Sequence, residues 1–361
     1  MYLLVAVGLI NSTAMGNRGR LIAPGGLQDE LPAAPGNDSD DTTEGESLVA
    51  LAARHGLRPS SERPSLVSYL HKVWGRRHFI MSYATARNVS MYTEARLGQL
   101  WQVLTPLLNS AVYYLIFGIL FKANRGISNY TAYLVIGVFI FAFTERSIVV
   151  GSTVIRANIT LIRALHFPRA CLPLAYVMVE FQQLLLSMIV MFAIVLGTGE
   201  PLTWYWLLLI PALLMQATFN MGAALIMARL GAGAQDISQL VPFLLRVWRY
   251  FCGVMYSIAS LPASLPEWAK NVLSFNPAAV YISLTRDAIM ATFRDDAPGA
   301  KPYNAAQCAV FTAKKIPALQ AYCHPDFGTG ELWLAGAGWA VVILVAGVIF
   351  FWQAETRYGR G

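Results

Sequence analysis

Charge is scarce in this sequence. Only 13% of its 361 residues are Asp, Glu, Lys or Arg, whereas 56% are hydrophobic. Soluble domains carry about 25% charged residues, so about half of the usual charge is missing. This deficit excludes an ordinary soluble globular protein and predicts a chain that lies largely in lipid.

Signatures of catalysis and of nucleotide binding are also lacking. The sequence has no GxxxxGK[ST] loop to cradle phosphates, so the chain is not its own P-loop ATPase. GxSxG and HExxH do not occur, and the five histidines are scattered without helical spacing. The four cysteines show no metal-ligand spacing. We therefore expect no catalytic residue, no metal site and no cofactor in this chain.

Long apolar runs are what the sequence does contain. About 20 apolar residues in a helix cross the hydrocarbon core of a bilayer, and the backbone there must be helical because lipid offers no hydrogen-bond partner. We therefore predict an all-α, polytopic membrane protein with a transmembrane domain over residues 104–352. Its six expected spans are Leu104–Phe121, Tyr130–Val150, Ala170–Leu196, Leu202–Ala228, Leu240–Ser260 and Leu332–Trp352.

The basic residues lie in short segments beside these runs. They precede the first span, separate the second from the third, follow the fourth, and end the chain: Arg76, Arg77, Arg87, Arg96, Arg156, Arg163, Arg169, Arg229, Arg357 and Arg360. The opposite short loops hold only Lys122 and Arg125, or the acid Glu200. Because cytoplasmic loops are rich in Lys and Arg, we expect both termini to be cytoplasmic. The net charge of +7 then reflects topology rather than a nucleic-acid groove.

Three segments outside the predicted spans differ from them in composition. Residues 1–65 include a stretch rich in Pro, Gly and acids, which predicts disorder, and we assign them no function. Residues 76–101 place aromatics on one helical side and arginines on another, which predicts an amphipathic helix lying in the membrane surface. An ordinary soluble amphipathic helix is the alternative. Residues 353–361 form the expected cytoplasmic tail.

Residues 262–290 contain two semi-apolar pieces, each too short to cross a bilayer. Three prolines are well placed to begin short helices there. We predict a re-entrant helical pair that enters the membrane from outside, with two surface helices as the alternative. Residues 294–330 are expected to form a polar external loop, in which Cys308 and Cys323 are candidates for a disulfide.

Several ionisable groups fall inside the predicted spans, where they are costly: Glu145, Arg146, Glu180, Arg246 and Arg249. One interpretation is a salt-bridged cluster at a cytoplasmic entrance, and the other is that the arginines extend to the lipid headgroups. The fifth span also contains "RVWRYF" at 246–251. Flat rings beside hydrogen-bonding groups suit the faces of sugars, although plain helix packing gives the same pattern.

Three motifs resemble one family, the type 2 ATP-binding-cassette export permeases. "NITLIRALHFPRACLP" at 158–173 resembles the family's loop after the second span. "ARNVSMYTEARLGQLWQVLTPLL" resembles its amphipathic entry helix, and "FNPAAVYISLTRDAIM" resembles its Asn-Pro element before the last span. The motifs rest on Leu97, Gly98, Trp101, Pro106, Asn276, Pro277 and Arg286. The resemblance covers about residues 76–355.

Among these permeases, the sequence is most similar to exporters of lipid-linked polysaccharides such as O-antigen, teichoic acid and actinobacterial galactan. The usage of Ala, Gly and Arg and the cysteine-bearing loop favour the galactan exporter. "GVFIFAFTER" departs from the family, which often carries Trp early in the second span. This departure leaves the identity of the exported polymer open.

The resemblance implies a permease subunit in the plasma membrane. Two copies of the chain would form one pathway, and two separate ATP-binding-cassette ATPase subunits would bind ATP and magnesium. Residues 155–169 would form a coupling helix that the ATPase grips, although topology alone also accounts for the arginines there. The expected coupling residues are Asn158, Leu161, Arg163, Phe167, Pro168 and Arg169.

The same resemblance suggests a route for the substrate. Arg87, Arg96 and Trp101 would receive the lipid pyrophosphate head, and the re-entrant pair would seal the outer mouth. The expected pathway residues are Tyr113, Tyr114, Glu180, Arg246, Trp248, Arg249 and Tyr250. One alternative is a membrane-embedded glycosyltransferase of cell-envelope assembly that uses Asp295 and Asp296, although a solvated turn explains these acids as well. Another is a purely structural membrane subunit.

Overall fold

The computed structural model describes residues 65–91, 98, 100–120, 129–164, 167–256, 258, 266–290 and 329–355. All of them belong to one compact unit, Pro59–Gly361. Several predictions therefore lie outside the described residues. These concern residues 1–64, Arg96, residues 262–265, the external loop over 294–328 with Asp295, Asp296, Cys308 and Cys323, and the tail from 356 onward.

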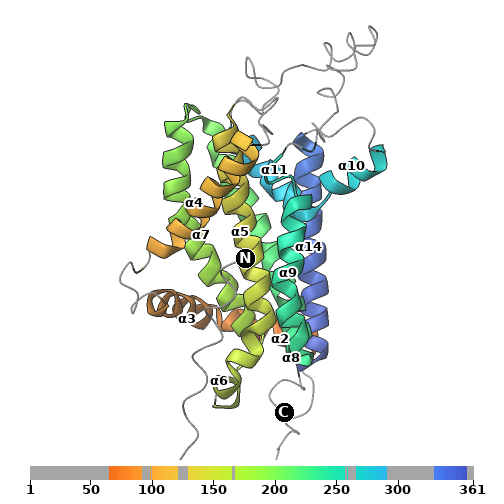
Figure 1. Ribbon diagram of the computed structural model, residues 1–361. Coiled ribbons are helices and arrows are strands. Elements are labelled where there is room, and N and C mark those ends of the chain that lie inside the picture. Colours follow the sequence, from red (N-terminus) through yellow and green to blue (C-terminus); the bar gives the residue numbers. More distant parts are fainter. Residues whose placement is uncertain are drawn as a thin grey trace, which may run out of the picture. The chain divides into compact units, whose positions relative to one another are not determined.

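Every regular element in the described ranges is a helix (Figure 1), as the sequence predicts. The elements are α2 (Leu66–Gly75), α3 (Arg77–Ser90), α4 (Leu100–Tyr113), η1 (Tyr114–Leu120), α5 (Tyr130–Ala157), α6 (Ile159–Ala164), α7 (Cys171–Gly197), η2 (Trp204–Leu208), α8 (Leu209–Gly233), α9 (Gln235–Phe251), α10 (Glu267–Ser274), α11 (Pro277–Ile289) and α14 (Thr329–Gln353).

Five helical segments in the described part of the chain are long and apolar enough to cross a membrane. They are Val103–Leu120, Tyr130–Ala157, Cys171–Gly197, Trp204–Gly233 and Gly330–Gln353. These segments coincide with the first four predicted spans and with the sixth. The chain is therefore a multi-pass, all-α membrane protein.

The predicted fifth span differs from the structure. Its residues fall on α9, which has 17 residues and ends at Phe251 rather than near Ser260. The helix ends because Gly253 adopts φ 63°, a left-handed conformation that α-helical residues do not adopt. At 1.5 Å per residue, α9 is about 26 Å long, which is close to the minimum for crossing a bilayer.

α5 lies at the centre of the bundle and packs against α4, α7, α8, α9 and α11. Its first half is apolar on every side, from Ala132 to Phe143, and almost all of these residues are buried. A helix that is apolar all round suits a position surrounded by other helices. α5 therefore contacts most of the other long helices, whereas the last span, α14, packs against α8 and α11.

Small residues bring α8 very close to two neighbouring helices. A Cβ on Gly231 would lie 1.8 Å from the carbonyl oxygen of Ser152 on α5. A Cβ on Gly222 would lie 2.3 Å from the carbonyl oxygen of Ile343 on α14. Close backbone contact through small residues supplies van der Waals attraction between membrane helices, where no hydrophobic driving force exists between them. The contacts fix α5, α8 and α14 as one packed group.

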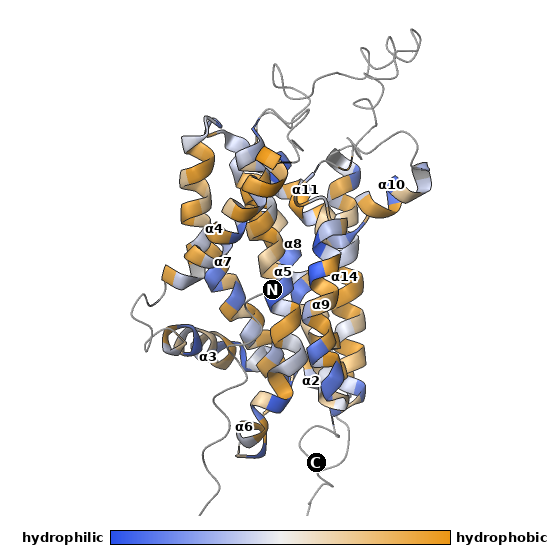
Figure 2. Cartoon of the chain, viewed as in Figure 1, coloured by the Kyte–Doolittle hydropathy of each residue, from blue (hydrophilic) through white to orange (hydrophobic). Residues whose placement is uncertain are grey.

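The outward sides of α4 and α14 are apolar (Figure 2). Exposed side chains there include Leu108 and Val112 on α4, and Val341, Val342 and Val345 on α14. Such surfaces are stable against lipid tails, whereas a soluble protein rarely exposes contiguous apolar patches of this kind.

Of the predicted amphipathic segment 76–101, the structure describes α3 and the first residues of α4, which begins at Leu100, whereas residues 92–97 and 99 lie outside the described residues. α3 packs against α7 and runs across the direction of the long helices in Figure 1. This orientation agrees with a helix that lies along a membrane surface, but that placement stays a prediction.

The region before the last span contains two short helices, as predicted. Asn276 caps α11 by accepting a hydrogen bond from the backbone of Ala278, and Pro277 occupies the first helical turn. α11 is mostly buried, whereas α10 exposes Trp268 and Val272. Whether the pair enters the membrane stays a prediction.

Candidate functional site

The segment 155–169, here called the strip, connects α5 to α7 and contains α6. Asn158 ends α5, and its side chain contacts three helices. Its Nδ2 donates to the Val154 carbonyl at 2.7 Å, and its Oδ1 accepts from the Tyr83 hydroxyl at 3.2 Å. Asn158 also lies within hydrogen-bond distance of Tyr176 on α7. The predicted coupling residue Asn158 therefore joins the strip to α3 and α7.

The other strip residues divide into inward and outward positions. Phe167 is half-buried, and its ring centre lies 5.4 Å from that of Phe79 on α3. Leu161 is also half-buried, beside the buried Ile162. Arg163 is exposed at the end of α6. The strip thus rests on the bundle through its apolar residues and presents Arg163 to the surroundings.

Arg169, at the end of the strip, contacts the end of the last span through Glu355. The Arg169 backbone amide donates to Glu355 Oε1 at 3.0 Å, and the Arg169 guanidinium donates to the Glu355 carbonyl. The Tyr69 hydroxyl of α2 donates to Glu355 Oε2 at 2.9 Å and accepts from the Ala170 amide at 3.3 Å. We call Tyr69, Arg169 and Glu355 the clamp, because together they join α2, the strip and the end of α14.

Burial changes the pKa values of two groups in the clamp, the Glu355 carboxyl and the Tyr69 hydroxyl. Desolvation raises the pKa of the Glu355 carboxyl, although hydrogen bonds from Arg169 and Tyr69 act in the opposite direction. Desolvation and the nearby Glu355 carboxylate raise the pKa of the Tyr69 hydroxyl, which therefore keeps its proton and donates it. The role of Glu355 could not be predicted, because no sequence pattern links it to Arg169, which lies 186 positions earlier.

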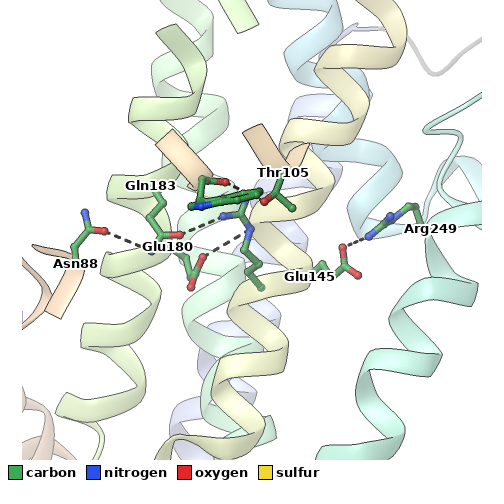
Figure 3. A network of polar contacts seen from close by, with 8 residues as sticks. Asn88, Thr105, Glu145, Glu180, Gln183 and Arg249 are labelled. Carbon is green, nitrogen blue, oxygen red and sulfur yellow. Dashed lines mark hydrogen bonds and ion pairs between the residues drawn. The ribbon is translucent and has the colours of Figure 1, made fainter. Parts of the chain in front are cut away.

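A second polar group lies inside the bundle, where α5 carries Glu145 and Arg146 in succession (Figure 3). Glu145 forms an ion pair with Arg249 of α9. Arg249 also donates to the Tyr113 hydroxyl of α4 at 2.5 Å, and its guanidinium carbon lies 5.3 Å from the ring centre of Phe141. Two predicted pathway residues, Tyr113 and Arg249, therefore contact each other directly, and Arg249 also pairs with Glu145, an acid that the pathway prediction omitted.

Arg146 points to the other side of α5, toward α7. Its Nη1 donates to Gln183 Oε1 at 3.2 Å, and its Nε lies 4.0 Å from Glu180 Oε2. Gln183 Nε2 in turn donates to Asn88 Oδ1 of α3 at 3.4 Å (Figure 3). These contacts connect α3, α5 and α7, and sequence reasoning missed Gln183 and Asn88 because uncharged amides do not stand out inside apolar runs.

We call these two groups together the belt: Asn88, Tyr113, Glu145, Arg146, Glu180, Gln183 and Arg249. The belt contains two acids and two arginines, so its formal charges cancel. Cancelled charges are far less costly in a low-dielectric interior than isolated ones. The interpretation as a salt-bridged cluster is therefore the one that the geometry favours for Arg146 and Arg249.

The remaining predicted pathway residues are not gathered at one place. Trp248 is half-buried, donates from Nε1 to Asn276 Oδ1 at 3.1 Å and packs edge-on against Phe141. By contrast, Arg246, Tyr250 and Tyr114 are exposed. Trp248 is thus occupied in holding α9 to α11, whereas the other three side chains are accessible.

The predicted entry residues are both on the outside of the bundle where the structure describes them. Arg87 is exposed on α3, and its guanidinium carbon lies 5.9 Å from the ring centre of Tyr176. Trp101 is exposed near the start of α4. They do not touch each other in the described contacts, so an entry site at these residues stays a prediction.

Arg286, which belongs to the Asn-Pro motif, binds backbone carbonyls of two other segments. It is fully buried in α11, and its guanidinium donates to the carbonyl of Tyr133 at 3.0 Å. It also donates to the carbonyls of Gly253 and Val254 at 3.0 and 2.9 Å. Arg286 therefore holds the turn that ends α9 against α5 and α11.

The sequence is similar to known membrane transport proteins. A family model described as "ABC-2 type transporter" matches residues 80–290, which contain the strip and the whole belt. An O-antigen export system permease protein RfbA from Klebsiella pneumoniae is 30% identical over 201 residues, which cover 55% of this chain and 75% of that protein. A second RfbA from the same organism is 28% identical over 201 residues, with the same coverage. An RfbA from Myxococcus xanthus is 24% identical over 213 residues, which cover 59% of this chain and 80% of that protein.

Proposed function

Because the chain belongs to the ABC-2 type transporter family, we propose that it is the permease of an exporter for a lipid-linked polysaccharide. The observation that carries this proposal is the family match over residues 80–290, supported by relatives named as O-antigen export permeases. Five segments suited to crossing a membrane agree with it. The substrate class we propose is a polymer on a lipid pyrophosphate carrier, with cell-wall galactan as the first polymer to test.

The energy for export would come from a separate ATP-binding-cassette subunit, because the chain has no P-loop of its own. We propose that two copies of the chain assemble with two such ATPases, which bind ATP and magnesium, in the plasma membrane. Both termini and the strip would then lie on the cytoplasmic side, in agreement with the distribution of arginines.

The strip is the proposed contact with the ATPase. Arg163 is exposed and suits an acidic partner, while Asn158, Phe167 and Arg169 hold the strip to α3, α7 and the end of α14. A push on the strip would therefore act on several helices at once. This arrangement is what a coupling element needs, because force applied to a loosely attached loop would move only the loop.

The belt and the exposed rings suit different parts of the substrate. The arginines of the belt pair with acids in this structure, and an anionic pyrophosphate head would have to compete with Glu145 or Glu180 for them. Tyr114 and Tyr250 are exposed and have the flat faces on which sugar rings pack. We propose that the head passes near Arg87 and the belt, and that the sugar chain passes along Tyr114 and Tyr250.

The experiment that tests the proposal is reconstitution. The chain is placed in vesicles with a candidate ATP-binding-cassette ATPase from the same organism, and ATP-dependent movement of lipid-linked galactan is compared with that of an O-antigen substrate. We expect export only with both subunits and hydrolysable ATP. The variant Arg163→Glu should reduce export and ATPase attachment, whereas Arg77→Glu on α3 is the matched charge-reversal control and should retain both.

Export of polymer by the chain alone would contradict the proposal. So would full export by Arg163→Glu in the presence of the ATPase, because the strip would then not be the point of contact. Export of O-antigen but not of galactan would retain the permease function and correct the substrate.

A further inference from the structure

Three polar side chains between α5 and α8 carry atoms with no hydrogen-bond partner among the residues that the structure describes. The atoms are Ser147 Oγ, Gln216 Oε1, and both Oδ1 and Nδ2 of Asn220. The three side chains are essentially fully buried, since the residues are 1%, 2% and 0% exposed. A buried polar group without a partner loses its hydration and gains nothing in return, so native structures satisfy almost all of them.

Two contacts of α8 fix the direction in which Asn220 points. One turn before it, Gln216 Nε2 donates to Thr144 Oγ1 of α5 at 3.0 Å. One turn after it, Ala224 packs against Gly151 of α5, where an added Cβ would lie 2.8 Å from the Ala224 Cα. Residues four apart lie on one side of a helix, so Asn220 faces α5 between these two contacts.

Ser147 lies at the corresponding level of α5. Thr144, Ser147 and Gly151 follow one another at spacings of three and four residues, which places them along one side of the helix. Thr144 pairs with Gln216 and Gly151 with Ala224, so the two helices run parallel here. Ser147 and Asn220 therefore occupy the same stretch of the α5–α8 contact.

The chemistry of these atoms selects the class of ligand. Gln216 Oε1 and Asn220 Oδ1 need a donor, Asn220 Nδ2 needs an acceptor, and the Ser147 hydroxyl takes either role. A metal cation would satisfy the oxygens only and would repel the amide hydrogens, and an anion would satisfy the donors only. Water both donates and accepts, and buried waters typically make about three hydrogen bonds.

We propose that one or two ordered water molecules are bound between α5 and α8, where they bridge Ser147, Gln216 and Asn220. The bridge lies between the direct Gln216 to Thr144 bond and the tight Gly151 to Ala224 contact. It gives the contact between α5 and α8 a hydrated point inside the membrane-spanning bundle. This inference does not depend on what the protein transports.

The sign of a stability change tests the proposal. Asn220→Leu replaces the amide by an apolar side chain of nearly the same size. If no water were bound there, this variant would remove two polar atoms without hydrogen bonds, Asn220 Oδ1 and Nδ2, and would raise the melting temperature. If water bridges them, it removes two of the water's partners, leaves Gln216 and Ser147 short of bonds, and lowers the melting temperature by several degrees.

Three further measurements complete the test, all with the full chain in lipid nanodiscs. Met221→Leu, the next residue, is the matched control for a change of shape and should leave the melting temperature nearly unchanged. Asn220→Leu with Ser147→Ala should recover part of the loss, because fewer polar atoms then remain without partners. A high-resolution cryo-electron microscopy map should show density within hydrogen-bond distance of at least two of the three side chains.

A rise in melting temperature for Asn220→Leu, or the absence of that density from a map that resolves water elsewhere in the protein, would overturn the proposal. A melting temperature of the wild type that falls when sodium is replaced by choline would also overturn it, because the ligand would then be a cation. If Asn220→Leu does not fold, the map of the wild-type protein decides the question alone.

Discussion

Removing the charge of Arg249 should destabilise the helix bundle strongly. Arg249 pairs with Glu145 and donates to Tyr113, so Arg249→Met leaves the Glu145 carboxylate without its counter-charge. Breaking a buried ion pair from one side costs about 3–5 kcal/mol. The side chains of Arg249 and Glu145 keep 13% and 22% of their exposure. Because water can still reach the remaining carboxylate, we expect the lower end of the range, about 3 kcal/mol.

Replacing both partners should restore most of this loss. In Glu145→Met with Arg249→Met no charge remains, and apolar replacements of buried ion pairs are often neutral, so we expect stability within about 1 kcal/mol of the wild type. The assay is a denaturant titration of the purified chain in one fixed lipid mixture, with both single variants and the double variant forming a double-mutant cycle.

An exposed arginine of the same helix supplies the control. Arg246 is exposed on α9, so Arg246→Met should stay within about 0.5 kcal/mol of the wild type. The buried ion pair would have no stabilising role if Arg249→Met were as stable as the wild type, or if the double variant lost as much stability as the two single variants together.

Three other predictions concern packing, protonation and transport. Gly231→Ala would place its Cβ 1.8 Å from a backbone oxygen and should cost at least about 2 kcal/mol in thermal unfolding, whereas Gly233→Ala meets nothing within 4 Å and should stay within about 1 kcal/mol of the wild type. Burial raises the folded-state pKa of Glu355 above its unfolded value, which is about 4.3. The protonated carboxyl therefore stabilises the fold at low pH, and this stabilisation is lost as the pH rises through the folded-state pKa. Glu355→Gln should remove this pH dependence from a series of melting temperatures. Tyr250→Ala should reduce export in vesicles without lowering the melting temperature, because Tyr250 is exposed, whereas Trp248→Ala should lower both, and the reverse pattern would exclude Tyr250 from the pathway.

The positions of the long helices could be predicted from the sequence because hydrophobicity alone determines which segments enter lipid. The run predicted over Ala170–Leu196 reappears as α7, shifted by one residue, and the run that begins at Tyr130 reappears as α5, which continues seven residues past the predicted end at Val150. The two short helices of residues 262–290 were also predictable, since Pro277 and Asn276 are strong signals for a helix start. Local chemistry is sufficient for features of this kind.

Features that depend on distant contacts could not be predicted in the same way. The turn at Gly253 that ends α9 is held by Arg286, which binds its carbonyls and lies more than 30 residues further along the chain. Glu355 meets Arg169 across 186 positions, and Trp248 meets Asn276 across 28. Charge and periodicity show that such residues need partners, but only the packed bundle determines which partners they find.

In the proposed mechanism, energy from a separate ATPase enters the bundle through the strip. The most direct measurement is the accessibility of a single cysteine at Arg163→Cys, in a background without other cysteines, to a thiol reagent that does not cross membranes. We expect labelling from the cytoplasmic side only, and protection from labelling when the ATPase is bound. Labelling from the external side only, or unchanged labelling with the ATPase attached, would contradict the account.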